Sequence, residues 1–213
     1  MIKAILFDMD GVLIEAKDWH YDALNRALEK FGMAIDRDAH LTTYDGLPTR
    51  RKLEMLSKTR GLPTRLHGFL NDLKQAYTLE IIYGKCKPNF THQRTLSRLK
   101  AEGYRLGVCS NSVRPTVETM MRLARLDGYL ELMLSNEDVQ KAKPDPEIYT
   151  AAMARMGVAP KETLILEDND HGIAAARASG AHVLVIGQKE DVNYDNIRRH
   201  IDQIRANAQA SAA

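Results

Sequence analysis

Five short apolar segments, each followed by polar residues or glycine, constrain this chain more than any other feature of its sequence. The first covers residues 2–7 and ends at two acidic residues. Apolar runs of this length suit strands that are buried on both faces of a parallel sheet. We therefore expect strands at residues 2–7, 104–109, 129–134, 163–166 and 182–186.

Helical patterns of about 10–15 residues lie between the later segments, and this alternation is typical of βαβ units. Gly103, Gly157 and Gly180 stand where such helices would end. The sequence thus predicts an α/β fold with a Rossmann-like, mostly parallel sheet flanked by helices. The expected helices cover residues 90–102, 115–126, 146–156 and 172–179.

The alternation is interrupted after the first strand, where helical patterns continue without a convincing buried strand. We interpret this stretch as an α-helical domain inserted into the sheet domain. The predicted boundaries are residues 1–14 plus 88–205 for the sheet domain and 15–87 for the insertion. Residues 206–213 are small and polar, and we expect a frayed tail there.

Composition excludes several classes of protein. Hydrophobic residues make up 44% of the 213 residues and charged residues 27%, as in ordinary globular domains. A net charge of +2 gives no basic excess for nucleic acid, and no apolar run approaches the roughly 18 residues of a membrane span. The two cysteines form no zinc or disulfide pattern. Because the amino terminus lacks the layout of a signal peptide, we expect a cytoplasmic protein. We also expect either a monomer or a weak dimer.

Polar residues follow the first strand at the sheet edge where open α/β folds bind ligands. Asp8 and Asp10 stand at alternate positions there, so one carboxylate can attack phosphorus while the other donates a proton. Gly11 permits a tight turn beside them. A turn with helix-capping acids is the alternative. An EF-hand is excluded because Leu13 and Trp19 occupy the positions of its glycine and glutamate.

Three later strand ends carry groups that suit phosphate or metal. Ser110 precedes a helix start, where a hydroxyl and backbone N–H groups can hold a phosphate oxygen, although serine is also a common helix cap. Lys143 lies in the proline-stiffened segment 141–146 and can act as a fixed positive charge, or as a plain surface lysine. Glu167 and Asp168 offer the oxygen ligands that Mg²⁺ prefers.

If the sheet closes as predicted, four acids meet at one place: Asp8, Asp10, Glu167 and Asp168. Like charges about 4 Å apart repel by roughly 4 kcal/mol at an effective dielectric of 20. Such a cluster therefore needs a cation or a protonated member. A divalent cation together with Lys143 would form a site for a dianionic phosphoryl group.

At these residues the chain resembles the haloacid dehalogenase superfamily of aspartyl phosphotransferases, in its β-phosphoglucomutase-like and phosphoglycolate-phosphatase-like branch. The resemblance covers nearly the whole chain and rests on DxDGVL from Asp8, the strand-end Ser110, KPxP from Lys143 and the acid pair Glu167-Asp168. It implies that Asp8 is the nucleophile that becomes phosphorylated. It also implies that Asp10 is general acid and then general base, and that its backbone carbonyl binds the metal.

The resemblance implies roles for the other motif residues as well. Ser110, Asn111 and Lys143 would hold the phosphoryl group. The inserted helices would form a cap that closes over the substrate and excludes water. The implied ligands of Mg²⁺ are Asp8, Asp10, Glu167 and Asp168.

The acid at Asp10 separates this chain from two branches of the superfamily. Dehalogenases lack an acid there, since a halide needs no proton, and transport ATPases carry threonine and membrane spans. Related mutases and phosphatases both have a histidine where His20 stands, which is otherwise a plain helix-face residue.

Residues of the insertion bear on the choice between phosphatase and mutase. Gly46 matches a loop that reaches the site in the family, and the mutases have arginine where Thr49 stands. Here Arg50 follows instead, turned inward or solvated, while Thr49 can cap the next helix. These residues and His20 are our candidates for substrate binding. We expect a Mg²⁺-dependent phosphatase of small phosphorylated metabolites; the alternatives are a sugar-phosphate mutase and a binding module without turnover.

Overall fold

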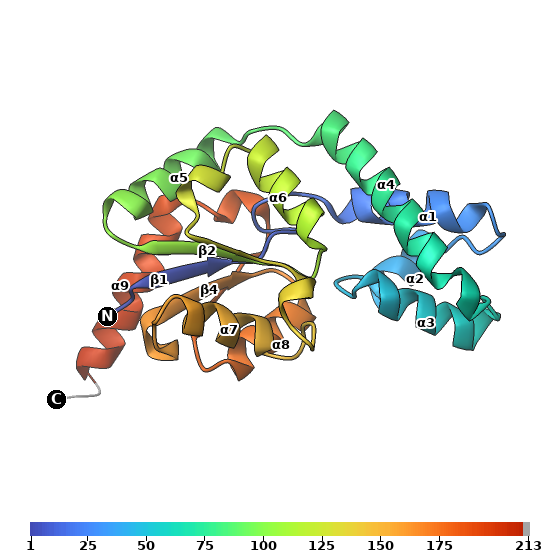
Figure 1. Cartoon of the computed structure of the whole chain (residues 1–213). Coiled ribbons are helices and arrows are strands. Elements are labelled where there is room, and N and C mark those ends of the chain that lie inside the picture. The colour runs from blue at the N-terminus through green and yellow to red at the C-terminus, as the bar shows by residue number, and fades with distance from the viewer. Residues whose placement is uncertain (211–213) are drawn as a thin grey trace. The chain divides into compact units, whose positions relative to one another are not determined.

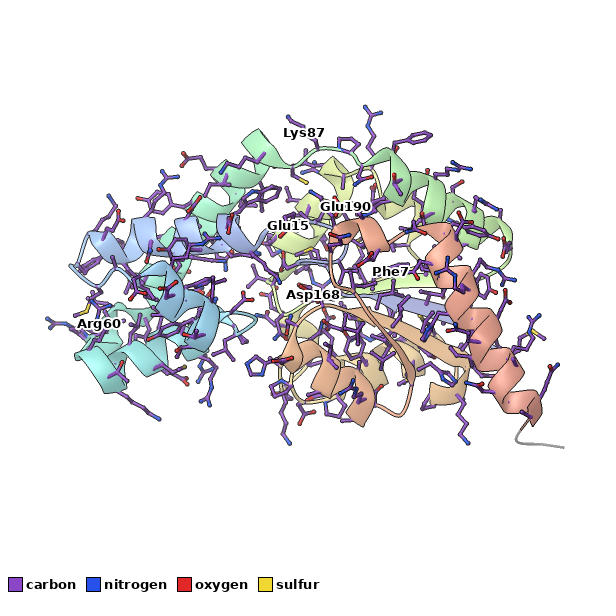
Figure 2. The ribbon with its side chains drawn as sticks, turned by 180° about the vertical axis from the view of Figure 1, so that it is seen from behind. Phe7, Glu15, Arg60, Lys87, Asp168 and Glu190 are labelled. Carbon is purple, nitrogen blue, oxygen red and sulfur yellow. The ribbon has the colours of Figure 1, made fainter. Side chains whose placement is uncertain are left out.

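The computed structural model describes residues 1–210 of the chain and divides it into two compact units. The first unit takes in Met1–Glu15 and the chain from Lys87 onward, and the second is Ala16–Cys86. Figure 2 labels Glu15 and Lys87, at which the chain leaves and re-enters the first unit. Each unit has its own cluster of buried apolar side chains.

A parallel sheet forms the centre of the first unit, with the strand order β3-β2-β1-β4-β5 in the described residues. The strands are β1 (Ala4–Phe7), β2 (Arg105–Cys109), β3 (Leu132–Leu134), β4 (Thr163–Glu167) and β5 (His182–Val185). The predicted α/β fold is confirmed. The expected third strand begins late, because Leu130 N donates to Asp127 O and folds Asp127–Tyr129 into a 3-10 turn.

Helices cover both faces of this sheet. Figure 1 shows α5 and α6 on one face and α7 and α8 on the opposite face. The helices are α5 (Phe90–Ala101), α6 (Arg114–Leu123), α7 (Glu147–Arg155), α8 (Asp170–Ala178) and α9 (Tyr194–Ala210). A frayed tail was expected from residue 206, but residues 206–210 belong to α9. The alanines there favour continuation of the helix. Residues 211–213 lie outside the described part of the chain.

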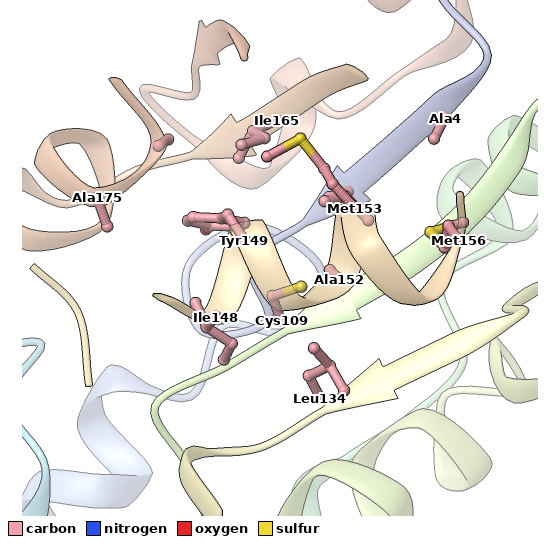
Figure 3. Packing of buried hydrophobic residues seen from close by; sticks show 12 residues of the cluster. Ala4, Cys109, Leu134, Ile148, Tyr149, Ala152, Met153, Met156, Ile165 and Ala175 are labelled. Atoms are coloured by element: carbon pink, nitrogen blue, oxygen red, sulfur yellow. The ribbon is translucent and has the colours of Figure 1, made fainter. Parts of the chain in front are cut away.

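The helix α7 shows how sequence periodicity builds the core. Tyr149, Ala152, Met153 and Met156 stand at helical spacing i, i+3, i+4 and i+7, so they share one face. Figure 3 shows this face packed among apolar side chains of the neighbouring strands and of α8. Burial of this stripe fixes α7 against the sheet. The segment with Lys143 directly precedes this helix.

The sheet reverses its order of growth beside β1. From β1 the chain adds β2 and β3 on one side, and then β4 and β5 on the other. Crevices at such a reversal, beyond the carboxyl ends of the strands, are where open α/β sheets bind ligands. The ends of β1 and β4 are held in register there, since Asp8 N donates to Leu166 O over 2.9 Å. Figure 2 labels Phe7 and Asp168 on these two strand ends.

The second unit is helical, and none of residues 16–86 lies in a strand. Its cluster of buried side chains includes Leu24, Leu28, Leu53, Leu56 and Leu70. Its elements are α1 (Lys17–Glu29), α2 (Arg37–Ala39), a π-helical turn (His40–Tyr44), α3 (Thr49–Arg60), a 3-10 turn (Thr64–Leu66) and α4 (His67–Lys85).

Across residues 1–210, no helix combines the length and the apolar character needed to cross a membrane.

Candidate active site

A buried lysine lies at the centre of the polar strand ends in the first unit. Lys143 Nζ donates to Asp8 Oδ1 over 2.6 Å, to Glu167 Oε1 over 2.7 Å and to the carbonyl oxygen of Cys109 over 2.8 Å. All three ammonium donors are therefore used by acceptors on β2, on β4 and just after β1. Burial lowers the pKa of Lys143, but the two carboxylates outweigh it and hold the pKa above its ordinary value. The lysine stays charged.

Asp8 lies directly after β1 and is almost fully buried. Burial, and then the neighbouring charge of Glu167, raise its pKa well above the usual value, while Lys143 acts in the opposite direction. Burial and the neighbouring acids therefore oppose ionisation of Asp8, and further positive charge nearby would favour it.

Three carboxylates converge around this lysine: Asp8, Glu167 and Asp168. One oxygen from each lies within 4.8 Å of the others, and two of the three residues are buried. The donor set consists only of hard oxygen atoms, and one ammonium cannot neutralise three carboxylates. Both properties fit a divalent cation such as Mg²⁺. The residues present therefore fit the metal that the sequence predicts.

Asp10 is placed by a tight turn that follows Asp8. Gly11 has a positive φ of 90°, and its N–H donates to the carbonyl oxygen of Ile14 over 2.7 Å. Only glycine adopts this conformation at little cost. The carboxylate of Asp10 accepts a hydrogen bond from Ser112 Oγ over 3.2 Å, and it does not belong to the three-carboxylate group above. The predicted four-acid cluster is thus corrected: Ser112 holds the carboxylate of Asp10, and the group found in the described residues contains Asp8, Glu167 and Asp168.

The end of β2 brings two predicted residues close to Lys143. Ser110 is buried, and its Oγ accepts from Ser112 N over 3.0 Å. The side chain of Asn111 pairs with the main chain of Lys143: Lys143 N donates to its Oδ1 over 3.1 Å, and its Nδ2 donates to Lys143 O over 3.4 Å. Asn111 therefore positions the lysine segment, and its part in substrate binding stays a prediction.

Two residues of this site were not predicted from the sequence. Ser112 follows Ser110 at the alternate position, and that spacing is the one signal that could have indicated it. Tyr149 reaches the site from α7, and its hydroxyl donates to Glu167 Oε1 over 2.5 Å. Burial raises the pKa of Tyr149, so the hydroxyl keeps its proton and remains a donor. Its position on an apolar helix face predicts only core packing.

The second unit gathers cationic side chains in its interior. Lys74 Nζ lies 3.3 Å from Nδ1 of His20, one of the predicted substrate residues. Lys52 and Lys74 are both buried. Burial, and then the charge of Lys52, lower the pKa of His40 to about 4, so this histidine is neutral at pH 7. The sequence reasoning did not indicate Lys52 or His40.

The loop before α3 carries the other predicted substrate residues. Gly46 has a positive φ of 70°. Thr49 is the first residue of α3, after Pro48 at the N-cap position, so it does not cap this helix. Arg50 Nε pairs with Glu54 Oε1 at 3.1 Å, and the arginine side chain is 88% exposed. Of the two orientations considered for Arg50, the solvated one is found.

Comparisons with known proteins show the family and the fold of this chain. A sequence model described as haloacid dehalogenase-like hydrolase matches residues 5–186. A phosphorylated carbohydrates phosphatase of Thermotoga maritima is 29% identical over 184 residues, which cover 84% of this chain and 82% of that protein. A beta-phosphoglucomutase of Bacillus subtilis is 28% identical over 196 residues, covering 88% and 84%.

A solved structure shares the fold. The beta-phosphoglucomutase of Clostridium difficile superposes with a TM-score of 0.84 at 19% identity, over 97% of this chain and 100% of that one. At this identity the likeness is one of fold.

Proposed function

This chain belongs to the haloacid dehalogenase-like hydrolase family, and on that premise we propose that it is a Mg²⁺-dependent phosphatase of small phosphorylated metabolites. The observation that carries the proposal is the contact of Lys143 with both Asp8 and Glu167, beside a third carboxylate at the end of β4. Hydrolysis of a phosphate ester through a covalent intermediate uses a protein nucleophile together with concentrated positive charge.

In the first half of the reaction, a carboxylate oxygen of Asp8 attacks the phosphorus atom of the substrate. A bond from this oxygen to phosphorus forms while the bond from phosphorus to the alcohol oxygen breaks. Asp10 donates its proton to the departing oxygen, so the product leaves as an alcohol. The hydrogen bond from Ser112 holds Asp10 ready for this transfer.

In the second half, water attacks the phosphorus atom of the phosphorylated Asp8. Asp10, now ionised, accepts a proton from this water, and inorganic phosphate and the Asp8 carboxylate are released. Lys143 stabilises the charge that returns to Asp8, since its Nζ already lies 2.6 Å from Oδ1. Ser110, at the end of β2, is placed to bind a phosphoryl oxygen in both halves.

Mg²⁺, when bound, supplies charge stabilisation for the phosphoryl oxygens. Asp8, Glu167 and Asp168 would hold it, together with the backbone carbonyl of Asp10.

The helical unit Ala16–Cys86 is the part of the chain that we assign to substrate selection. Its buried lysines, Lys52 and Lys74, give it positive character, which suits an anionic metabolite. The name of the Thermotoga maritima relative, a phosphatase of phosphorylated carbohydrates, supports a sugar phosphate as the substrate class.

A sugar-phosphate mutase is the second candidate, favoured by the 28% identity to a beta-phosphoglucomutase. A mutase must hold a second phosphate, and the related mutases use an arginine where Thr49 stands. Within its own unit, Arg50 pairs with Glu54. We take the threonine at this position as support for hydrolysis.

The decisive experiment measures release of inorganic phosphate from a panel of sugar phosphates, phosphoglycolate and nucleotides. We expect release in Mg²⁺, none in EDTA, and recovery when Mg²⁺ is added again. Brief incubation followed by acid quench and mass spectrometry should locate the phosphoryl group on Asp8. Turnover in metal-free buffer, or a phosphoryl group on another residue, contradicts the proposal.

Phosphorus NMR separates the two enzyme candidates. β-Glucose 1-phosphate with a bisphosphate primer yields free phosphate from a phosphatase and an isomerised sugar phosphate from a mutase. Isomerisation as the main product would replace our proposal with the mutase.

A further inference from the structure

Tyr149 is a fully buried side chain of α7 whose ring belongs to the apolar core and whose hydroxyl reaches the site. Figure 3 shows the ring beside Ile165 of β4, and the cluster around it is apolar. The hydroxyl donates to Glu167 Oε1 over 2.5 Å. A hydroxyl carried on a well-packed ring has little freedom to move, so this hydrogen bond is directed by the core itself.

The two carboxylate oxygens of Glu167 have different hydrogen-bond partners. Oε1 accepts from Tyr149 and, over 2.7 Å, from Lys143, which uses both of its lone pairs. Oε2 accepts from Asp168 N over 3.2 Å. One acceptor position of the carboxylate is left, and it is on Oε2. The pattern thus selects the oxygen that can face a cation or a cation-bound water.

The helix α8 confines the same carboxylate from another side. A Cβ placed on Gly172 would lie 2.0 Å from Glu167 Oε1 and 2.1 Å from Oε2, so only glycine fits there. Glu167 is itself fully buried. The carboxylate therefore lies against the backbone of α8, with Tyr149 and Lys143 fixing its rotation.

Lys143 also contacts the ring of Tyr149. Its Nζ lies 4.8 Å from the centre of the Tyr149 ring, which is within the range of a cation–π contact. The three donors of this lysine are already used, so it cannot take over the hydrogen bond that Tyr149 makes to Glu167. Loss of the hydroxyl would leave a buried lone pair of Oε1 unsatisfied and remove one of the hydrogen bonds that fix the orientation of the carboxylate.

We infer that Tyr149 is a positioning residue for Glu167: its hydroxyl fixes the orientation in which that carboxylate contributes to the cation site. The inference rests on the proposed function, because it assigns Glu167 to the metal. Groups that orient metal-binding side chains in this way typically change metal affinity or activity by about 10–100-fold when they are removed.

The test compares Tyr149→Phe with the wild-type protein by titration with Mn²⁺ alone, in the absence of substrate. Phenylalanine keeps the ring, its packing and the contact with Lys143, and removes only the hydroxyl. We expect Mn²⁺ affinity to fall about tenfold. Steady-state rates should show the same shift in the Mg²⁺ concentration for half activity, with most of kcat regained at saturating Mg²⁺.

The matched control is Tyr104→Phe. Tyr104 precedes β2, at the end opposite Ser110, and its hydroxyl also bonds a charged group, accepting from Arg198 Nη1 over 2.6 Å. This variant should keep the Mn²⁺ affinity of the wild type.

A double-mutant cycle with Glu167→Gln separates positioning from a general structural effect. If Tyr149 acts through the Glu167 carboxylate, Tyr149→Phe causes no further loss of Mn²⁺ affinity in the Glu167→Gln background. Equal losses in both backgrounds, or no loss in the single variant, overturn the inference. Phosphate release by the wild type tests the proposed function separately, since Mn²⁺ titration needs no turnover.

Discussion

The two units of this protein place buried cations in opposite surroundings. In the first unit, Lys143 gives its donors to two carboxylates and a carbonyl at 2.6–2.8 Å, inside an excess of acidic groups. In the second, Lys52 and Lys74 are buried near histidines, and the carboxylate of Asp45 stands 4.0 Å from His40 Nε2. The first arrangement suits a metal cation. Our proposal assigns the chemistry to this unit and substrate selection to the helical unit.

Asp8→Asn should give the largest effect and tests the chemistry of the first unit. Removal of the nucleophile should lower phosphate release by at least about 10⁴-fold. Because burial and Glu167 raise the pKa of Asp8, a neutral side chain should leave the melting temperature unchanged or higher. Release assays and circular dichroism check this, with Asp127→Asn on the exposed surface as control. Activity near the wild-type level would remove Asp8 from the mechanism.

Lys143→Met should be the most destabilising of these changes. It keeps a similar volume but leaves Asp8 and Glu167 buried without their cation, and loss of one partner from a buried pair costs about 3–5 kcal/mol. Urea unfolding at pH 8 measures this, and Mg²⁺ should restore part of the stability by binding the folded state. Lys141→Met is the control, since that side chain is 73% exposed. Equal stabilities of the two variants would contradict the central place of Lys143.

His40→Gln tests the buried positive character of the second unit through pH. The folded state holds His40 neutral, with a pKa of about 4 against 6.5 in the unfolded chain, so its contribution is present above pH 6.5 and lost as the pH falls towards 4. Wild-type stability should therefore fall by about 2 kcal/mol more than that of the variant between pH 8 and pH 5. Urea unfolding at pH 8 and at pH 5 gives the free energies of unfolding of both proteins. A packing change in the variant affects both pH values equally, so it cancels in the difference. Identical pH slopes would show that His40 is not held neutral.

Lys74→Met should have the smallest effect and sharpens the assignment of selection to the helical unit. We expect KM for a good substrate to rise by about tenfold while kcat changes by less than about threefold, the pattern of lost substrate binding. Initial rates over a range of substrate concentrations provide both constants, and Lys58→Met on the exposed face of α3 is the control. A selective loss of kcat would instead place Lys74 in the chemistry.

Much of the first unit could be predicted from its sequence, because one rule locates both the buried strands and the acidic residues that follow them. Strands buried on both faces are apolar throughout, so each change to polar residues marks a strand end, and parallel strands bring those ends to one edge. This rule pointed to Asp8, Glu167 and Asp168, and the proline-stiffened segment pointed to Lys143; the structure brings the four residues together. Their roles in catalysis stay predictions.

Contacts that come from helices follow no such rule. The reach of Tyr149 to Glu167 depends on how α7 lies on the sheet, and helical periodicity predicts only which face is buried. Asn111 shows the same limit, since its position after β2 does not indicate that its side chain pairs with the backbone of Lys143. In the second unit, burial of Lys52 could not be predicted because lysines usually lie at the surface.

The central position of β1 in the sheet also affects how the protein folds. Its neighbours β2 and β4 start only at Arg105 and Thr163. Both edges of β1 are therefore completed by pairing over long separations along the chain, and pairing of this kind is slow. The segment that carries Asp8 reaches its final surroundings only when β4 has joined the sheet, so a chain cut before Thr163 lacks the assembled candidate site.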